Sequence, residues 1–313
     1  MSGPSHEMNE PLKIGLVGLD SSHCVEYAGL LHDATHPHHV PGARIVTAYP
    51  GGSADWPLSA SRVPGFAERM KTEFGVPMAA SLEEVAEASD AIMILAVDGR
   101  VHRPQFEVIA KAGKPVYIDK PLSVTEVDAR KIRNVSQATG ARVFSASVWR
   151  FSRGLSEAIA TLDGPCRHAH LHGQWPLEDG LHGWFYYGIH QVEMLYAAMG
   201  PGCRRVACNR DGASEVLTGF WDDGRVATIA TNHEEHRPFG GWLLGETNSA
   251  LLAVKDSKHE RYRAFLEKTL AFFRGAETSV ALPETLETIE FLAAAATSAG
   301  QEGKPVAIQS YTP

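Results

Sequence analysis

Short apolar runs alternate with helical segments over the first 120 residues, and this alternation restricts the fold more than any other feature of the chain. The runs are apolar enough to be covered on both faces, which is typical of parallel strands. The predicted strands are residues 13–19, 43–48, 91–97 and 115–119. The predicted helices are residues 22–31, 66–74, 81–88 and 104–112, with a long loop at 49–65. We therefore predict an α/β domain with a doubly wound parallel sheet at residues 12–122, after a disordered leader at residues 1–11.

Beyond residue 122, strands follow one another more closely. The pattern predicts a meander whose hairpin turn is Asp222-Asp223-Gly224. The predicted strands are residues 142–147, 168–174, 204–209, 215–220, 225–231 and 305–308. The predicted helices are residues 125–139, 155–162, 182–199 and 282–299. We predict that residues 123–313 form an α+β domain with an open, mostly antiparallel sheet. One face of that sheet has no predicted helix, so a homodimer or homotetramer is expected.

The totals exclude several classes of function. A chain of 313 residues is long enough for two domains. Its net charge of −8 argues against a nucleic-acid or anionic-membrane partner. No apolar run reaches the roughly 18 to 20 residues that span a bilayer, and no secretory signal is visible, so we expect a cytoplasmic protein. The four cysteines show no C-x-x-C pairing, which fits free thiols in a reducing compartment.

One lysine stands at the exit of a predicted buried strand, in Val116-Tyr117-Ile118-Asp119-Lys120-Pro121-Leu122. The proline restricts Lys120 to extended backbone geometry. Ligands of open α/β sheets bind at the carboxyl edge of the strands, so Lys120 is placed to meet one. A desolvated lysine there can donate a proton, although an exposed lysine at a strand end has the same sequence pattern.

Several motifs in order resemble the Gfo/Idh/MocA oxidoreductases. Asp119-Lys120-Pro121 is similar to the Glu-Lys-Pro signature of that family, and Gly188-Ile189-His190 with Glu193 is similar to its Gly-Val-His…Asp helix. The stretches 97–102, 112–116 and 303–306 also match. The resemblance spans about residues 13 to 308 and implies a Rossmann domain joined to an open-sheet substrate domain. It also implies NAD or NADP as cofactor and hydride transfer as the reaction.

The predicted nucleotide loop departs from the family pattern. Of the fingerprint glycines only the first, Gly18, remains in Gly18-Leu19-Asp20-Ser21-Ser22-His23. Asp20 stands where pyrophosphate would approach, and a protonated His23 is one way to offset its charge. An alternative is that Asp20 caps the first helix and closes the site. Ser21 and Ser22 offer donors to an anion. The resemblance implies cofactor contacts from these residues and from Asp98, His102 and Asp119.

The acid that reads the ribose hydroxyl is also missing, because the second strand ends at Ala48-Tyr49-Pro50. The nearest arginine is Arg62. These residues therefore favour neither NAD nor NADP.

The substrate helix carries the predicted acid–base residue. The family often has an Asp four residues before the His, whereas Tyr186 stands there in this chain. Acid–base work then falls on His190, whose unperturbed pKa of about 6.5 suits it, and on Lys120, with Tyr186 as a further candidate. The predicted substrate contacts are Lys120, Trp184, Tyr187, His190 and Glu193. The aromatic cluster, which also includes Trp175 and Phe185, fits either a sugar-like ring or core packing.

The histidines allow one other chemistry. His168, His170 and His172 alternate along one predicted strand and share a face. With Glu178, Asp179 or His182 they could bind a divalent metal, although a solvated or subunit-facing strand explains the same pattern. We predict no metal site, and we expect the same of His36, His38 and His39 and of the His233-Glu234-Glu235-His236 stretch.

Three functions follow from these observations. The first is an NAD(P)-dependent oxidoreductase acting on a sugar, cyclitol or related polyol. The second is a protein of the same fold that binds a sugar-like ligand without redox turnover. The third is a metal-dependent lyase or hydrolase built on the His-rich strand.

Overall fold

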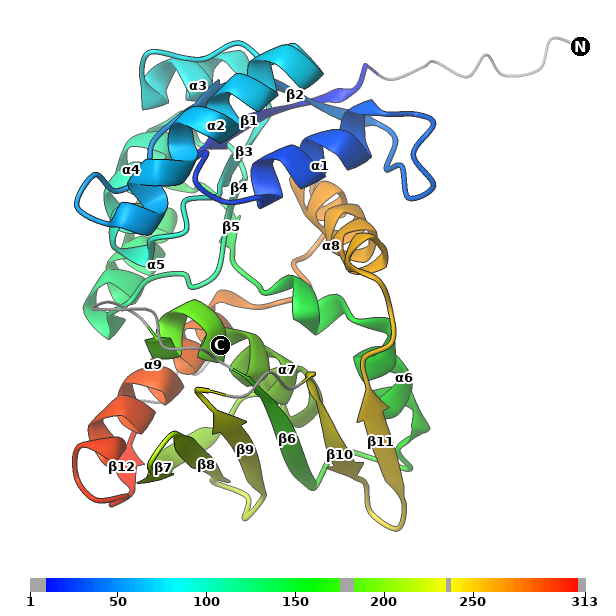
Figure 1. Ribbon diagram of the computed structural model, residues 1–313, viewed down its shortest axis with the longest axis vertical. Helices are drawn as coiled ribbons and strands as arrows, with labels where there is room; N and C mark the ends of the chain where they lie inside the picture. The colour runs from blue at the N-terminus through cyan, green and yellow to red at the C-terminus, as the bar shows by residue number, and fades with distance from the viewer. Residues whose placement is uncertain (1–9, 175–182, 235–237, 309–313) are drawn as a thin grey trace, which may run out of the picture.

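The computed structural model describes residues 10–174, 183–234 and 238–308, and its strands form two sheets. Figure 1 shows the sheets one above the other, joined by helices that run between them. The predicted leader at residues 1–11 lies almost wholly outside the described residues. Among the described helices, none is long and apolar enough to cross a bilayer.

The first sheet is parallel, in the order β2-β1-β3-β4-β5. Its strands are β1 (Leu12–Val17), β2 (Ala43–Tyr49), β3 (Ala91–Ile94), β4 (Val116–Ile118) and β5 (Val143–Phe144). The helices in this part of the chain are α1 (His23–His32), α2 (Pro57–Phe74), α3 (Leu82–Ala88), α4 (Gly99–Ile109) and α5 (Glu126–Thr139). Alternate residues of a strand pack into different cores, as Leu16 and Val17 do, so both faces are covered. The predicted doubly wound parallel sheet is confirmed.

The domain around this sheet includes residues beyond the predicted range 12–122. The strand β5 pairs with β4, so the sheet continues past the boundary predicted at residue 122. The helix α8 (Lys258–Phe273) returns from the second half of the chain and places Phe265 and Leu270 in the same core as Leu16. The sequence showed the strand at 142–147 but not its sheet, because pairing partners cannot be read from a short apolar run.

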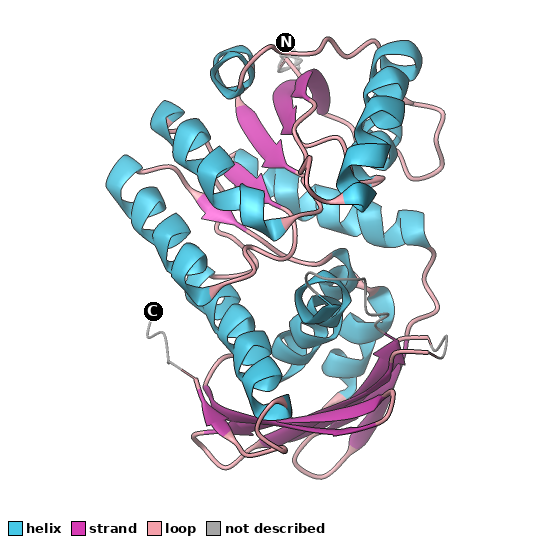
Figure 2. Cartoon of the chain, turned by 60° about the vertical axis from the view of Figure 1, so that its left-hand side comes forward, coloured by secondary structure: helices cyan, strands magenta, loops and turns pink. Residues whose placement is uncertain are grey.

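The second sheet is mixed and mostly antiparallel, in the order β11-β10-β6-β9-β8-β7-β12. Its strands are β6 (His168–Gln174), β7 (Cys203–Asp211), β8 (Ser214–Trp221), β9 (Val226–Asn232), β10 (Gly240–Leu244), β11 (Ser249–Ala253) and β12 (Val306–Ala307). Only the pair β6–β9 is parallel among these described strands. The helices α6 (Arg153–Thr161), α7 (Ile189–Met199) and α9 (Leu282–Ala299) lie on one face, and Figure 2 shows the other face without a helix. The predicted open sheet is confirmed.

Two helices begin earlier than predicted. The predicted loop at 49–65 is wrong in its second half, because α2 starts at Pro57 and continues through Pro64. A proline suits the first turn of a helix, so Pro57 marks a start where composition alone indicated a loop. The helix α4 likewise starts at Gly99, with Asp98 as its N-cap, and contains Pro104.

Candidate active site

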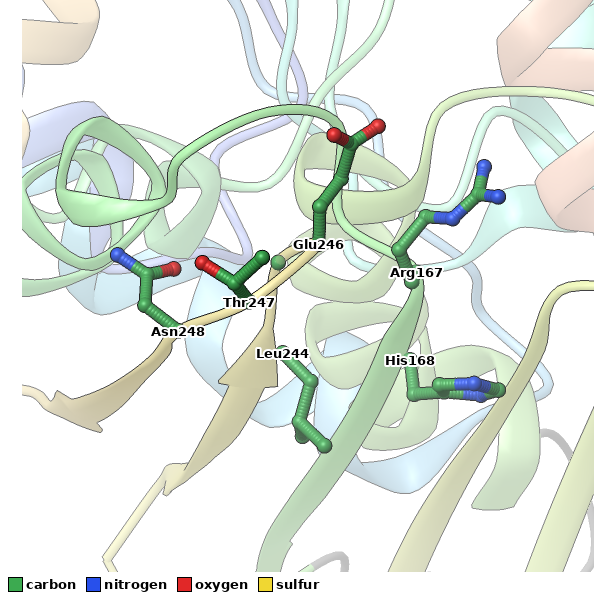
Figure 3. A pocket seen from close by; sticks show the side chains of 7 residues that line it. Arg167, His168, Leu244, Glu246, Thr247 and Asn248 are labelled. Atoms are coloured by element: carbon green, nitrogen blue, oxygen red, sulfur yellow. The ribbon is translucent and has the colours of Figure 1, made fainter.

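A surface pocket of about 520 Å³ opens where β6 begins and β10 ends (Figure 3). Its lining includes Arg167, His168 and the turn from Leu244 to Asn248. None of the residues predicted to bind cofactor or substrate lines it. The predicted site residues lie elsewhere, and several of them follow the carboxyl ends of strands in the first sheet.

Lys120 follows the end of β4, and its peptide bond to Pro121 is cis. The side chain is buried, and Nζ donates to the Tyr186 carbonyl oxygen at 3.4 Å and lies 5.1 Å from the Tyr186 ring centre. Burial lowers the pKa of Lys120, and the neighbouring Asp119 carboxylate partly opposes that shift. The predicted lysine thus faces the start of the substrate helix and not solvent.

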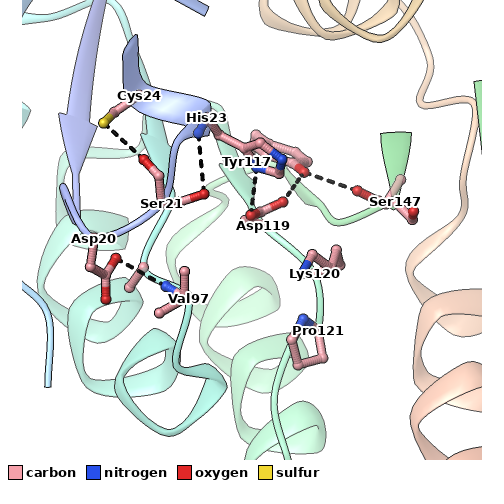
Figure 4. Close-up of polar contacts among 12 residues, drawn as sticks. Asp20, Ser21, His23, Cys24, Val97, Tyr117, Asp119, Lys120, Pro121 and Ser147 are labelled. Atoms are coloured by element: carbon pink, nitrogen blue, oxygen red, sulfur yellow. Dashed lines mark hydrogen bonds and ion pairs between the residues drawn. The ribbon is translucent and has the colours of Figure 1, made fainter. Parts of the chain in front are cut away.

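Asp119 is a buried carboxylate held by side chains of α1 and β4 (Figure 4). It pairs with Nδ1 of His23 at 2.9 Å and accepts a hydrogen bond from the Tyr117 hydroxyl at 2.8 Å. Despite the cost of burial, His23 and Lys120 hold its pKa below the ordinary value. His23 therefore bonds to Asp119 and not to Asp20, which corrects the predicted pairing.

His190 lies in the first turn of α7, after a π-helical turn at Trp184–Gly188. Its Nδ1 is 2.6 Å from the Ser147 hydroxyl, and its ring lies near Trp149, Tyr187 and Phe239. Burial lowers the pKa of His190 well below the ordinary value, and the charge of Lys120 acts in the same direction.

The two predicted acid–base residues meet at one pair of tyrosines. Lys120 lies over the Tyr186 ring, the Tyr186 and Tyr187 ring centres are 4.9 Å apart, and Tyr187 is 5.9 Å from the His190 ring. One residue follows a strand of the first sheet and the other sits on a helix of the second. The two side chains therefore flank the same pair of tyrosines, one from each domain.

The loop after β1 keeps the tight turn of a nucleotide site, and its one acid points into the protein. Gly18 has φ +89°, and a Cβ there would lie 2.5 Å from the Ala96 nitrogen. Asp20 is buried and accepts hydrogen bonds from the Val97 N–H at 3.1 Å and the Ser59 hydroxyl at 2.6 Å. Burial raises its pKa. Asp20 therefore neither faces a pyrophosphate nor caps α1, and both expectations for it are wrong.

The remaining loop residues fit a dinucleotide. Because Asp20 turns inward, no carboxylate of this loop opposes a phosphate. Ser22 is exposed at the start of α1, where a helix favours an anion. Ser21 is buried, and its hydroxyl accepts from the His23 N–H.

The polar atoms of Asp98 and His102 are already bonded to other groups of the protein. Asp98 is fully buried, caps α4 and binds the Ser53 hydroxyl and the Arg100 guanidinium. The two ring nitrogens of His102 lie 2.8 Å from the Ala96 oxygen and 2.9 Å from the Pro121 oxygen. These contacts support the turn that carries Lys120. The resemblance had implied that both residues contact the nicotinamide ribose directly. With these bonds, neither side chain is placed to do so.

Glu193 and Trp184 also differ from their predicted substrate contacts. Glu193 is 1% exposed and paired with Arg150. Trp184 is half-buried and packs on the main core. Sequence reasoning missed Ser147, Trp149 and Phe239, which surround His190 but belong to no motif quoted above. Trp175 lies outside the described residues.

The His-rich strand points away from this site. His168, His170 and His172 are exposed on the face of β6 opposite the helices, while Ala169 and Leu171 are buried. Glu178, Asp179 and His182 lie outside the described residues, as do Glu235 and His236. Within the described residues, no three His, Cys, Asp or Glu side chains are arranged to hold a metal ion. The geometry thus gives the third function no support.

The fold defines a class of protein, in which a Rossmann-type domain is joined to a domain with an open, mostly antiparallel sheet. Residues 60–147 match the family model described as "Oxidoreductase family, NAD-binding Rossmann fold", Gfo/Idh/MocA. The match is limited to these residues, and over them the predicted resemblance to the Gfo/Idh/MocA oxidoreductases is confirmed.

A relative with a known activity matches only part of the chain. The inositol 2-dehydrogenase of Cereibacter sphaeroides is 35% identical over 95 residues, 29% of this chain and 28% of that protein. The chain therefore matches less than a third of this relative's length.

Solved structures match over almost the whole length. The myo-inositol dehydrogenase of Lactobacillus casei, in complex with NAD(H) and myo-inositol, has a TM-score of 0.76 at 13% identity, over 97% of this chain and 98% of that one. The myo-inositol 2-dehydrogenase of Lactobacillus plantarum has a TM-score of 0.75 at 16% identity, over 96% and 100%. At these identities the likeness shows the fold alone.

Proposed function

We propose that this protein is an NAD(P)-dependent oxidoreductase that acts on a cyclitol, sugar or related polyol. The observation that carries the proposal is the convergence of Lys120 and His190 on the Tyr186–Tyr187 pair from two different domains. Bound NAD or NADP would accept or supply the hydride. The start of α1, where Ser22 is exposed, would hold its phosphates.

The two side chains divide the remaining chemistry. Among the described residues Lys120 makes one long hydrogen bond, to a carbonyl oxygen, and it keeps donors for the substrate oxygen at the reacting carbon. His190 has a depressed pKa, so it is neutral near pH 7 and can take the hydroxyl proton during oxidation or return it during reduction. Tyr186 orients Lys120 through its backbone carbonyl and its ring, and a buried phenol makes a poor base.

The polyol class rests on the surroundings of His190 and on the relatives. Aromatic rings from Trp149, Tyr187 and Phe239 gather around the imidazole. Such rings accept the apolar face of a sugar-like ring while its hydroxyls meet polar groups. The names of the relatives above, inositol dehydrogenases, point to the same class of substrate.

Turnover of the purified protein tests this proposal. With NAD or NADP and a panel of inositols and sugars, reduced nicotinamide should accumulate. Lys120→Ala should lower kcat by about 100-fold or more, because it removes the group that polarises the reacting oxygen. Lys111→Ala changes an exposed lysine beyond α4 and is the matched control. Full turnover in Lys120→Ala would refute the mechanism.

A second candidate function is ligand binding without redox turnover. The observation that favours it is the loss of the later fingerprint glycines, replaced by a loop that includes Ser21 and His23. Addition of NAD or NADP should raise Tm if the first proposal holds. A polyol that raises Tm while neither nucleotide does would favour the second.

We also propose that the protein is a homodimer or homotetramer that buries the open face of the second sheet. Val216, Trp242 and Leu251 are 41%, 50% and 59% exposed, and all three lie on that face. Large apolar side chains gathered on one uncovered sheet are typical of an interface.

A further inference from the structure

The orientation of His190 is not explained by the residue that stands four positions before it. Tyr186 occupies that position, and its ring lies against Trp56, Tyr187 and Lys120. Within the described part of the chain, His190 has one hydrogen-bond partner, the Ser147 hydroxyl, and no carboxylate touches its ring nitrogens.

Ser147 is itself firmly held. It is fully buried in the turn that follows β5, and its Oγ accepts a hydrogen bond from the Trp149 N–H at 3.2 Å. From the same turn, Arg150 donates to the backbone and side-chain oxygens of Glu193 at 3.2 Å each. Because Glu193 is three residues after His190, these bonds attach the turn to α7 one helical turn beyond the imidazole.

We propose that Ser147 is the positioning residue of His190, a role that rests on the function proposed above. The 2.6 Å contact fixes the ring and commits Nδ1, which leaves Nε2 for the substrate. A hydroxyl can donate to Nδ1 when the proton is on Nε2, and it can accept from Nδ1 when Nε2 is the base. A carboxylate can only accept, and it would stabilise the charged ring. Ser147 therefore supports proton transfer in both directions.

The charges that surround His190 agree with this arrangement. Burial lowers the pKa of His190 most, the charges of Lys120, His23 and Arg261 lower it further, and the Asp119 carboxylate raises it. The described partner of Nδ1 is a neutral hydroxyl, which does not balance the positive charge of a protonated His190. The acid limb of the pH profile should therefore lie below the ordinary pKa of a histidine, and Ser147→Asp should move it upward.

Kinetics of Ser147 variants test the role. Ser147→Ala should lower kcat by about 10- to 100-fold with KM nearly unchanged, because the ring is misplaced while the substrate still binds. Ser147→Thr, which keeps the hydroxyl, should recover most of the loss. Ser145→Ala removes a buried hydroxyl two residues earlier and should behave as the wild type. Unchanged kcat and pH profile in Ser147→Ala would overturn the proposal.

A second measurement does not depend on turnover. The ¹⁵N resonances of the His190 ring, assigned by their absence in His190→Gln, report which nitrogen carries the proton. Ser147→Ala should change the balance between the two nitrogens, and Ser147→Asp should favour Nδ1–H and raise the pKa. If the wild type turns over no polyol with either nucleotide, the proposed function fails, and these resonances alone then decide the role of Ser147. Identical ring resonances in wild type and Ser147→Ala would refute it.

Discussion

Burial changes the pKa of one acid beside the proposed site, Glu193. Its carboxyl group is 1% exposed and shares Arg150 with Glu284. Burial raises the pKa of Glu193 to about 7; Arg150 lowers it, and the second acid raises it. One arginine between two acids favours a proton on one of them, and the buried Glu193 is the one that takes it.

This shift predicts a pH dependence of stability. Between about pH 4.5 and pH 7 the folded protein binds a proton that the unfolded chain releases. The contribution is fully present below pH 4.5 and is lost as the pH rises through about 7, so stability should fall by up to about 3 kcal/mol across this window. Glu193→Gln should remove that part of the slope, as measured by urea unfolding at several pH values.

The exposed Glu157 provides the control for this prediction. Its side chain is 70% exposed, so Glu157→Gln should leave the slope as it is in the wild type. An unchanged slope in Glu193→Gln would show that Glu193 titrates at its ordinary pKa.

Single residues also mark where sequence reasoning reached its limit. Lys120 and His190 were predicted from motifs, and the structure brings both to one pair of tyrosines. The direction of the Asp20 side chain could not be predicted, because its partners Ser59 and Val97 are distant in sequence. Ser147 belongs to no sequence motif and is 43 residues from His190, so only the fold shows that the two side chains meet.

At the scale of elements, the segment from Gly51 to Ser59 ties three strand ends together. Its Ser53 hydroxyl donates to Asp98 after β3, and its Ser59 hydroxyl donates to Asp20 after β1. A Cβ on Gly51 would lie 3.2 Å from the Gly18 Cα, so this segment, which itself follows β2, rests on the predicted nucleotide turn. It was predicted as a loop from its composition, and its bonds make it part of the site's framework.

Two glycines allow this connection to be tested. Gly52 has φ +91°, and a Cβ there would lie 2.8 Å from Val63 and 2.9 Å from the Ser59 hydroxyl. Gly52→Ala should therefore lower the free energy of unfolding by about 1–3 kcal/mol. Gly65 is exposed inside α2, with nothing within 4 Å of an added Cβ, so Gly65→Ala should raise it by about 0.5–1 kcal/mol. Urea denaturation of both variants measures the difference, and equal midpoints would mean that the segment tolerates a side chain.

At the scale of the whole molecule, strand periodicity predicted both sheets but not how the chain is shared between them. The alternation of buried and exposed residues was visible for β6, which was predicted with its observed bounds. The helix α8 joins the first sheet from the second half of the chain, a long-range contact that no local pattern encodes. The strands β10 and β11 complete the second sheet and were not predicted.

These two strands also carry Trp242 and Leu251, the two most exposed large apolar side chains on the described part of the open face, so they test the proposed self-association. Trp242 of β10 pairs directly with Leu251 of β11, and both side chains are at least half exposed. Trp242→Glu should leave the fold intact and shift the protein toward monomers, because a buried carboxylate without a partner opposes association. Sedimentation over a range of concentrations measures the mass. Val127→Glu, which changes a valine of α5 that is 52% exposed and lies outside the second sheet, should leave the mass unchanged. A wild type that stays monomeric at every concentration would show that this face does not pair with a second copy.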